Sequence, residues 1–505
     1  MIPILLVAAC TESASDARSL AVAHAASLLP LPTTVTPGDT TFSLPSSAKI
    51  VHSGAPDEAA FLSAWLSAAT GFPLPVSTSS PTRGDVALVL DADAALPAEG
   101  YVLDVTADGV TITASDNAGI FYGTQTLRQL FPPGILGADV ADGIAWIAPT
   151  VHIEDAPRFG WRGVMIDVAR HFFDAPEIER QVDLAAAHKL NRLHLHLTDD
   201  QGWRFEVPGW PLLTEVGGAT EVEGGIGGYY ATAEYAGLVA YAAARHMVVV
   251  PEIDFPGHAN AALASYAELN ESGVVAEVFT GTEMHSASLW LEGPDTARFV
   301  SDVWQAVAAA TPTAYVHVGA DEAINTPVDA YGPFVQSLQA IADSHEKTMI
   351  GWDEIGTVAL TPPFLAQHWA DVENATRAVA QGAGVIESPG EHAYLDMIYD
   401  FDAEYGQVWA GPVNVERAYD WDPVPDGLTE ASVTGVEGTL WTEYIDDREK
   451  MDFMMWPRLA CIAEVGWSAQ SVRAWETFSP RLAWHGKRLD ALGVGFYRSP
   501  EMAWE

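Results

Sequence analysis

An eightfold rhythm between residues 151 and 505 constrains the fold of this chain more than any other feature. Short apolar runs typical of strands recur there, and a segment with helically spaced apolar residues follows each of them. The runs are residues 162–169, 191–198, 247–255, 314–321, 347–354, 364–370, 384–390 and 435–443. Eight strand-then-helix repeats predict an α/β fold, a closed (β/α)8 TIM barrel. An open doubly wound sheet is the alternative, although no glycine-rich phosphate loop follows the first run.

Two stretches of this region carry specific helix signals. Residues 174–177 combine a capping aspartate, an early proline and a glutamate three positions on, so a helix is expected to begin there. Residues 232–246 predict a second helix, whose apolar face is formed by Tyr235, Leu238, Val239 and Ala242. Both helices would lie between strands, as a barrel requires.

The preceding region, residues 31–150, has a different rhythm and predicts a small α+β domain. Strand-like and helical runs alternate in it, at residues 57–70, 85–90, 101–114 and 118–131. The Asp108-Gly109 pair predicts a hairpin turn, because both residues tolerate positive φ. This region contains no constellation of catalytic groups, so the chemistry is expected in the barrel.

The charge balance of the chain excludes one class of partner. Its 505 residues include 68 acidic and 24 basic ones, which gives a formal net charge of −44. Nucleic acid is not expected to bind, because phosphate recognition needs a basic surface. The acidic residues are spread along the chain and are interpreted as a solvated surface suited to a salty medium, not as an interaction tail. No stretch reaches the roughly 18 apolar residues of a membrane span.

The first residues, MIPILLVAAC, resemble the end of a bacterial lipoprotein signal. In such signals the chain is cut before the cysteine, which is then lipidated. We therefore expect export, with residues 1–30 as signal and tether and a lipid anchor at Cys10, at the cell surface or in the periplasm. An ordinary cleaved signal peptide is the alternative, and the absence of Lys or Arg before the apolar run departs from the usual pattern. Cys461 lies in an apolar run and is expected to be a small buried hydrophobe.

Acids and aromatic residues recur where the barrel strands are expected to end, and barrels place their chemistry at those ends. The candidates are Asp167, Arg170, His171, Asp199, Asp200, Glu252, Asp254, His258, Asp321, Glu322, Trp352, Asp353, Glu354, His368, Trp369, Tyr394, Asp396, Trp441 and Glu443. A single aspartate of this kind is usually a cap, and a single tryptophan usually belongs to the core. Their coincidence at most strand ends indicates a sugar site, in which acids bind hydroxyls and indoles cover the apolar face of a pyranose.

A metal site was the other chemical interpretation of these positions. His258, His317 and His368 lie near acids, but no H-E-x-x-H or other tight ligand spacing occurs. We therefore expect no metal and no cofactor, and interpret the histidines as groups that orient carboxylates.

The sequence HVGADEA, residues 317–323, places two acids side by side, Asp321 and Glu322. Glycosidases with two catalytic carboxylates hold them roughly 5 Å or more apart, on either side of the scissile bond. Adjacent residues have Cα atoms only about 3.8 Å apart. The pair therefore calls for a mechanism other than the two-carboxylate one.

Seven motifs identify the family that the barrel region resembles. They are WRGVMIDVARHF, LHLHLTDDQGWR, PEIDFPGH, HVGADE, GWDE, YLDM and LWTE, in chain order between residues 161 and 467. Together they resemble glycoside hydrolase family 20, the β-N-acetylhexosaminidases, and AGIFYGTQTLRQL resembles that family's small N-terminal domain. One departure is Ala320, where the family often has a second glycine, and little effect is expected from it.

The resemblance implies a substrate-assisted, retaining mechanism, one of the exceptions to the two-carboxylate scheme. The acetamido oxygen of the substrate attacks the anomeric carbon, and water opens the resulting oxazolinium. Glu322 is then the general acid and base, and Asp321 orients the acetamido group. Other implied ligands of an N-acetylhexosamine-containing oligosaccharide are Tyr394 at the acetamido oxygen, Trp352, Trp369 and Trp441 as pocket walls, Arg162, Glu443 and Asp396 at the hydroxyls, and Asp200, His258 and His317 as supports.

Two other functions stay open from the sequence. A two-carboxylate retaining glycosidase would use Glu354 or Glu443 as nucleophile, and would not need an N-acetyl group. A surface lipoprotein that binds glycans without cutting them is the second. The natural glycan, the gluco or galacto preference and the oligomeric state cannot be read from the sequence.

Overall fold

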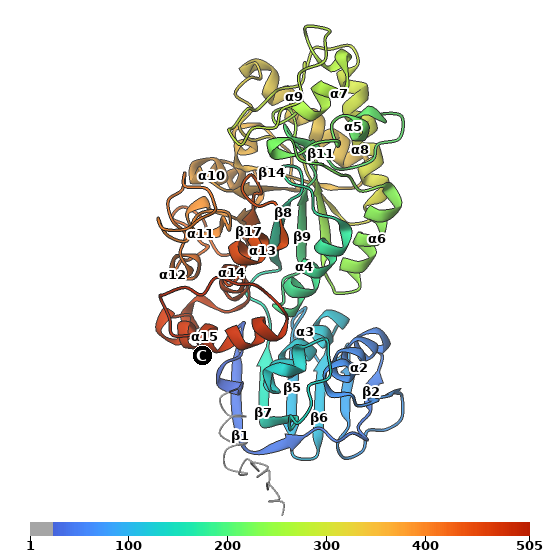
Figure 1. The fold of residues 1–505 in the computed structure, drawn as a ribbon, viewed down its shortest axis with the longest axis vertical. Helices are drawn as coiled ribbons and strands as arrows, with labels where there is room; N and C mark the ends of the chain where they lie inside the picture. The colour runs from blue at the N-terminus through green and yellow to red at the C-terminus, as the bar shows by residue number, and fades with distance from the viewer. Residues whose placement is uncertain (1–23, 505) are drawn as a thin grey trace, which may run out of the picture. The chain divides into compact units, whose positions relative to one another are not determined.

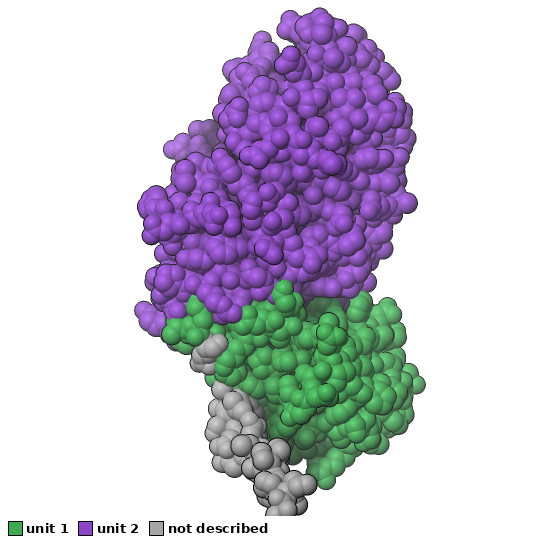
Figure 2. All heavy atoms as spheres, in the orientation of Figure 1, with its two compact units in different colours: residues 1–156, 478–493, 503–505 green, residues 157–477, 494–502 purple. Residues whose placement is uncertain are grey.

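The computed structural model describes residues 24–504 and divides into two compact units (Figures 1 and 2). Of the described residues, the first unit contains 24–156, 478–493 and 503–504, and the second contains 157–477 and 494–502. Cys10, the expected lipidation site, lies outside the described residues. Among the described residues, no helix is long and apolar enough to cross a membrane.

The first unit is built on a seven-stranded mixed sheet, with the strand order β1-β7-β5-β6-β4-β2-β3. The strands are β1 Thr34–Ser43, β2 Ile50–Ser53, β3 Val76–Ser77, β4 Val86–Leu90, β5 Tyr101–Thr106, β6 Gly109–Ala114 and β7 Ile147–Asp155. Helices α2 (Pro56–Thr70) and α3 (Asn117–Leu130) pack against the sheet. The pairing of Thr106 with Gly109 confirms the predicted hairpin. The α+β expectation is therefore confirmed.

The long C-terminal helix α15 (Trp475–Ala491) differs from the expectation that everything after residue 150 belongs to the barrel. Most of it belongs to the first unit, where its buried Arg488 donates hydrogen bonds to the carbonyl oxygens of Ser27 (2.6 Å) and Gln129 (3.0 Å). Ser27 thus forms part of this unit, although residues 1–30 were expected to lie outside the fold. The pattern of α15 alone could not show which unit its buried face would join.

The second unit is a closed barrel of eight parallel strands, which confirms the prediction from the eightfold rhythm. The strands are β8 Trp161–Asp167, β9 Arg192–His196, β12 Val248–Glu252, β13 Tyr315–His317, β14 Thr348–Trp352, β15 Phe364–His368, β16 Gly384–Glu387 and β17 Val433–Leu440. Strand β17 pairs with β8, from Gly435 opposite Trp161 to Leu440 opposite Ile166, and this pairing closes the cylinder.

Helices follow most barrel strands, as the sequence predicts. They are α4 Ala175–Ala187, α5 Leu212–Glu215, α6 Thr232–Ala243, α7 Asn260–Ser265, α8 Thr296–Ala310, α9 Val328–Ser344, α10 Val372–Ala380, α11 Gly390–Ala393, α12 Val415–Tyr419, α13 Arg448–Met455 and α14 Arg458–Trp467. Asp174 caps α4 by accepting a hydrogen bond from the Glu177 amide, and the buried face of α6 is the predicted one. Cys461 is buried within α14, as expected. The short pair β10 (Thr198–Asp199) and β11 (Gly202–Trp203) follows β9.

The interior of the barrel is layered, because alternate residues of each strand point inward. One layer is an apolar cluster of Trp161, Val250, Ile350 and Ile386. The next inward positions carry buried polar groups instead: His194, Glu252, His317, Gln367 and Glu437. Barrel interiors are usually filled by branched aliphatic side chains, so this polar layer is an unusual feature.

Candidate active site

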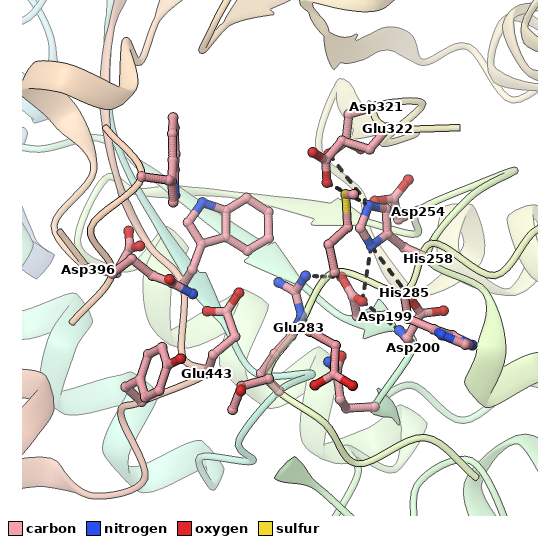
Figure 3. A pocket seen from close by; sticks show the side chains of 18 of the residues that line it. Asp199, Asp200, Asp254, His258, Glu283, His285, Asp321, Glu322, Asp396 and Glu443 are labelled. Atoms are coloured by element: carbon pink, nitrogen blue, oxygen red, sulfur yellow. Dashed lines mark hydrogen bonds and ion pairs between the residues drawn. The ribbon is translucent and has the colours of Figure 1, made fainter. Parts of the chain in front are cut away.

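A cavity of about 540 Å³ opens at the carboxyl ends of the barrel strands, as expected for this fold (Figure 3). Its walls come from the segments that follow every barrel strand except β14. The lining includes most of the predicted sugar ligands: Asp200, His258, Asp321, Glu322, Trp369, Tyr394, Asp396, Trp441 and Glu443. Residues that lie more than 200 positions apart in the sequence thus share one pocket, with polar and aromatic groups mixed in its wall.

The backbone after β13 explains how two adjacent acids serve different parts of the cavity. Gly319, Ala320 and Glu322 have φ values of 66°, 77° and 41°, in the left-handed region that side chains other than glycine rarely adopt. The Asp321 side chain is 12% exposed, whereas the Glu322 side chain is 34% exposed. Asp321 therefore lies at the buried side of the cavity and Glu322 at its open side.

Asp321 sits in a poorly solvated environment. Burial, followed by the neighbouring Asp254 carboxyl, raises its pKa well above the usual range. Its Oδ1 atom is buried and has no hydrogen-bond partner among residues 24–504. A buried acceptor without a donor is costly, so this atom is suited to an N–H group brought by a ligand. Asp254 itself accepts a hydrogen bond from the Ala320 amide (3.1 Å), and burial raises its pKa to about 7.

His258 links the open-side acid Glu322 to a carboxylate in the floor. Its Nε2 atom lies 3.6 Å from Glu322 Oε2, and its Nδ1 atom lies 3.2 Å from Asp199 Oδ1. Burial opposes a charge on this ring, but the Asp199 carboxylate outweighs burial and holds the pKa of His258 well above its usual range. His258 is therefore an imidazolium at neutral pH, placed beside Glu322.

The aspartate that supports His258 is Asp199, a strand-end candidate to which the family resemblance assigned no role. The selected neighbour, Asp200, lies 3.9 Å from His258, and its Oδ1 accepts hydrogen bonds from the amides of Asn260 (2.9 Å) and Ala287 (3.2 Å). Asp200 thus ties two loops of the cavity wall together. A sequence pattern could not separate the two acids, because adjacent side chains diverge and only the fold decides which one meets the histidine.

The far wall of the cavity presents carboxylate oxygens without partners. Figure 3 shows Asp396 and Glu443 across the pocket from Asp321 and Glu322. Both side-chain oxygens of Asp396 and the Oε2 atom of Glu443 are buried without a hydrogen-bond partner among the described residues. Burial, followed by Glu443, raises the pKa of Asp396 well above its usual range. Such acceptors are suited to the hydroxyl groups of a sugar.

The prediction that Arg162 binds sugar hydroxyls is wrong. Arg162 lies near the start of β8, is fully buried, and donates to the carbonyl oxygens of Phe159 (2.7 Å) and Lys189 (2.9 Å). Its guanidinium lies over the ring of Trp467 in α14. The position is at the wrong end of the strand and on the face opposite to the barrel interior. Arg170, past the end of β8, lines the cavity instead.

Arg170 is held in place by two carboxylates. Its Nη2 atom lies 2.8 Å from Asp199 Oδ2, and its Nη1 atom lies 3.2 Å from Asp167 Oδ2. The signal for Arg170 was its place after a predicted strand, which Arg162 lacks. The family resemblance nevertheless implied Arg162 as the ligand of the hydroxyls.

Aromatic rings enclose the cavity between these two walls. Trp369, Tyr394 and Trp441 line it as predicted, and Trp409, which the sequence analysis did not select, completes the rim at 52% exposure. Trp409 packs edge-on against Tyr394, with centroids 5.3 Å apart. It lies in an irregular segment without strand or helix periodicity, so no sequence signal marked it.

Trp352 and His317 lie behind the cavity and do not line it. Trp352 is fully buried, packs against Trp441 with centroids 5.7 Å apart, and donates its indole N–H to Glu252 Oε1 (2.9 Å). His317 Nδ1 lies 3.0 Å from the same oxygen. Trp352 therefore backs the wall that Trp441 forms, instead of forming it as predicted.

Several groups of imidazole and carboxylate side chains have the composition of metal ligands. Within the described residues they are His194, Glu252 and His317; His196, Asp199 and Asp254; Asp199, Asp200 and His258; and Asp254, His258 and Asp321. In most of these groups an imidazole nitrogen and a carboxylate oxygen lie within ion-pair distance. That pairing orients the carboxylates, in line with the interpretation of the histidines, although Asp254 Oδ2, His258 Nε2 and Asp321 Oδ1 have no hydrogen-bond partner among the described residues.

A pocket walled by carboxylates and aromatic rings at the top of a TIM barrel is characteristic of a carbohydrate-active enzyme. Comparison with known proteins defines the family. The catalytic-domain profile of glycosyl hydrolase family 20 matches residues 159–331 and 325–470, and the profile of that family's domain 2 matches residues 25–156. The chain belongs to glycosyl hydrolase family 20, the family that the sequence motifs resemble.

Individual relatives agree with this assignment. A beta-N-acetylhexosaminidase of Cellulomonas fimi is 41% identical over 425 residues, which cover 83% of this chain and 84% of the relative. The structure of the GH20 beta-N-acetylhexosaminidase of Streptomyces coelicolor A3(2) superposes with a TM-score of 0.92 at 42% identity, covering 95% of this chain and 99% of that one. A mutant Streptomyces plicatus beta-hexosaminidase in complex with its product GlcNAc gives the same TM-score at 42% identity, covering 95% and 98%.

Proposed function

We propose that this chain is an exo-acting, retaining β-N-acetylhexosaminidase that removes terminal β-linked GlcNAc or GalNAc from glycans or chitin oligosaccharides by substrate-assisted catalysis. The observation that carries the proposal is the divergence of Asp321 and Glu322 into the buried and the open side of one cavity. Relatives in the same family include an N,N'-diacetylchitobiase of Vibrio harveyi, 28% identical to this chain.

In the first half of the reaction, the acetamido carbonyl oxygen of the substrate attacks the anomeric carbon and the bond to the leaving oxygen breaks. Glu322 gives its proton to that oxygen, which leaves as an alcohol. The unpaired buried Oδ1 of Asp321 accepts a hydrogen bond from the acetamido N–H and stabilises the positive charge that grows on the nitrogen.

In the second half, water attacks the anomeric carbon of the oxazolinium from the opposite face. The carboxylate of Glu322 now takes a proton from that water, the ring oxygen of the oxazolinium returns to the acetamido group, and the product keeps the original configuration. His258, held between Asp199 and Glu322, orients the acid through both halves.

The remaining walls recognise the sugar itself. Tyr394 donates to the acetamido oxygen, while Trp369 and Trp441 cover the acetamido methyl group and the ring. Arg170 donates to the hydroxyls, and the buried carboxylate oxygens of Asp396 and Glu443 accept from them. Replacing an N-acetyl sugar by a plain one would remove both the internal nucleophile and these acetamido contacts.

The environment of Glu354 argues against a two-carboxylate mechanism with that residue as nucleophile. Its Oε2 atom accepts a hydrogen bond from the Trp369 indole (3.2 Å), and burial, followed by Asp321, raises its pKa to about 8. A nucleophilic carboxylate must be ionised, whereas Glu354 carries a proton at neutral pH.

Hydrolysis of p-nitrophenyl N-acetyl-β-D-glucosaminide beside the plain β-D-glucoside tests the proposal, for wild type and Glu322→Gln. We expect turnover of only the N-acetyl substrate, and a loss of roughly 10²–10⁴-fold in kcat in the variant, because proton transfer to the leaving oxygen is removed. Equal turnover of both substrates would point to an enzyme nucleophile such as Glu443. Binding of GlcNAc oligomers without turnover of any would favour a glycan-binding protein.

We further propose that the protein is exported and anchored by a lipid on Cys10. The run MIPILLVAAC, which ends in a small-residue triplet before cysteine, supports this proposal. Metabolic labelling with an alkyne palmitate in a bacterial host is expected to mark the wild type and not Cys10→Ala. Equal absence of label in both proteins would contradict the anchor.

A further inference from the structure

A column of buried side chains with alternating acidic and imidazole groups runs through the barrel interior to the active site. From the apolar layer upward its members are Glu437, His194, Glu252, His196, Asp199, His258 and finally Glu322. The first six are at least nine-tenths buried. Asp199, His258 and Glu322 belong to the active site described above. The four lower residues, Glu437, His194, Glu252 and His196, do not line the cavity.

Glu437 on β17 forms the lower end of the column. Its Oε1 atom lies 2.8 Å from His194 Nδ1 and accepts from Gln367 Nε2 (3.0 Å), while its Oε2 accepts from the Trp161 indole (2.9 Å). A side chain at Gly163 would place its Cβ 2.1 Å from Oε2, so the glycine makes room for this carboxylate. Glu437 is therefore held on three sides, on top of the apolar layer.

Glu252 on β12 is the centre of the column, since three imidazole rings and one indole surround its two oxygens. His196 Nδ1 (2.6 Å) and His194 Nε2 (3.0 Å) approach Oε2, while Trp352 Nε1 (2.9 Å) and His317 Nδ1 (3.0 Å) approach Oε1. His196 and Trp352 form hydrogen bonds with the carboxylate, and His194 lies within ion-pair distance of it. His317 Nδ1 instead accepts a hydrogen bond from the Gly319 amide (3.1 Å). Glu252 thereby joins the column to Trp352, which backs the cavity wall.

The upper half of the column reaches the catalytic acid. His196 Nε2 lies 2.8 Å from Asp199 Oδ2, and the other oxygen of Asp199 faces His258 Nδ1 at 3.2 Å. His258 Nε2 then lies 3.6 Å from Glu322 Oε2. Each contact fixes the orientation of the next ring.

The geometry determines the charges in this column. Both nitrogens of His194, and both of His196, face a carboxylate oxygen within 3.0 Å. A neutral imidazole has only one N–H, and its other nitrogen would direct a lone pair at the second carboxylate. His196 forms a hydrogen bond through each nitrogen and is therefore an imidazolium between two carboxylates. His194 forms one to Glu437 through Nδ1, and the Glu252 carboxylate beside its Nε2 favours the imidazolium by charge. The electrostatics agree, because Glu437 and Glu252 outweigh burial and raise the pKa of His194 to about 9.

The remaining charged groups around the column balance it. Arg170 and Asp167 flank Asp199 from β8, and the buried His317 beside Glu252 is neutral, because burial lowers its pKa. Asp200, Asp254 and Asp321 face His258 from the cavity side, and burial raises the pKa of each of them. The net attraction on His258 therefore comes chiefly from Asp199.

We propose that the four lower residues of the column are positioning residues of the reaction, which hold Asp199 ionised and His258 cationic and turned toward Glu322. The inference rests on the proposed hexosaminidase function. Glu437 keeps His194 charged, His194 and His196 together keep Glu252 ionised, and His196 fixes Asp199. A substitution of Glu437 is thus expected to affect the catalytic acid Glu322, although the two residues do not touch.

Glu437→Gln tests this proposal, because it removes one charge with little change in volume at a residue outside the cavity. Without the carboxylate that faces His194, the pKa of the ring falls. The imidazolium rings of the column therefore lose their protons at a lower pH than in the wild type. The alkaline limb of the kcat profile is therefore expected to move down by about one pH unit, a tenfold loss of kcat on that limb. KM should not change, since Glu437 does not touch the sugar. Glu252→Gln is expected to give a larger shift.

Glu387→Gln is the matched control. Glu387 is a buried barrel carboxylate on the neighbouring strand β16, and its Oε2 lies 2.7 Å from His368 Nδ1 on β15. Among the described residues, no hydrogen bond or ion pair joins Glu387 or His368 to the column. The control is expected to lower the melting temperature as Glu437→Gln does, but to keep the alkaline limb of the wild type. The same limb in all three proteins would overturn the proposal.

Ring ¹⁵N chemical shifts of the wild-type protein give a second test that does not require any variant to fold. We expect His194, His196 and His258 to remain doubly protonated at pH 8. Neutral rings at His194 and His196 would overturn the column even if hexosaminidase activity is present. Charged rings in a protein without hexosaminidase activity would instead refute the proposed function and leave the charged column intact.

Discussion

At the residue scale, the two arginines near β8 show how the position along a strand decides the role of a side chain. Arg162 donates to backbone carbonyls at the start of the strand, whereas Arg170 pairs with Asp199 and lines the cavity. Both are charged and buried, so neither composition nor burial separates them. The two arginines differ in the end of β8 at which they lie and in the face of the strand to which they point.

Substitution of the two arginines is expected to separate binding from stability. Arg170→Ala should lower kcat/KM by roughly 10–100-fold, because a charged hydrogen bond to the substrate is worth about 1.5–3 kcal/mol. Arg162→Lys should lower the melting temperature and leave KM unchanged, since its partners are backbone carbonyls. Steady-state kinetics and thermal unfolding of both variants check this. A rise in KM for Arg162→Lys would show that it acts on the sugar after all.

At the element scale, the turn after β13 is the most constrained segment of the site. The Asp254 carboxyl packs so closely on Gly319 that an added Cβ would lie 1.8 Å from Asp254 Oδ1, and φ at Gly319 is 66°. Ala320 adopts a φ of 77° without being a glycine, so the departure from the family pattern carries backbone strain. The positive φ values of this turn direct Asp321 to the buried side of the cavity and Glu322 to its open side.

Gly319→Ala is expected to abolish activity and to destabilise the fold by more than about 3 kcal/mol, because steric overlap adds to a disfavoured φ. Gly237→Ala provides the control, since Gly237 lies within α6 and nothing is within 4 Å of its added Cβ. The control should stabilise the fold by about 0.5–1 kcal/mol. Denaturant unfolding and the N-acetylglucosaminide assay check both, and wild-type activity in Gly319→Ala would refute the role of the turn.

At the scale of the whole molecule, the formal net charge of −44 is the dominant property. Like charges repel one another in the compact state, and dissolved salt screens that repulsion, with a Debye length of about 10 Å at 0.1 M and 3 Å at 1 M. The buried column is charge-balanced and is screened little, so the effect of salt belongs to the surface.

The melting temperature is therefore expected to rise by on the order of 2 °C between 0.02 M and 1 M NaCl, since about 2 kcal/mol of relieved repulsion, divided by the unfolding entropy of a chain of this length, produces a shift of this size. Thermal unfolding at several salt concentrations checks this. Choline chloride should give the same rise, because screening does not depend on the identity of the ion. A flat or falling melting temperature would mean that salt-sensitive ion pairs outweigh the repulsion.

The sequence by itself determined the barrel, the N-terminal α+β domain, the family and the pair Asp321 and Glu322. These features follow from local periodicity and from short contiguous motifs, both of which are present in the order of the residues. The eight strands, the cap at Asp174 and the buried face of α6 are as predicted for this reason.

Only the tertiary structure decided which residues meet. Arg170, and not Arg162, lines the cavity, and Asp199, and not Asp200, pairs with His258. Trp352 lies behind the wall that Trp441 forms, and most of α15 belongs to the first unit. It also assembled the column from Glu437 to His258, whose members come from separate strands and loops. The physical reason is that strand register and barrel closure set the direction and the depth of each side chain, and neither is a property of a single segment.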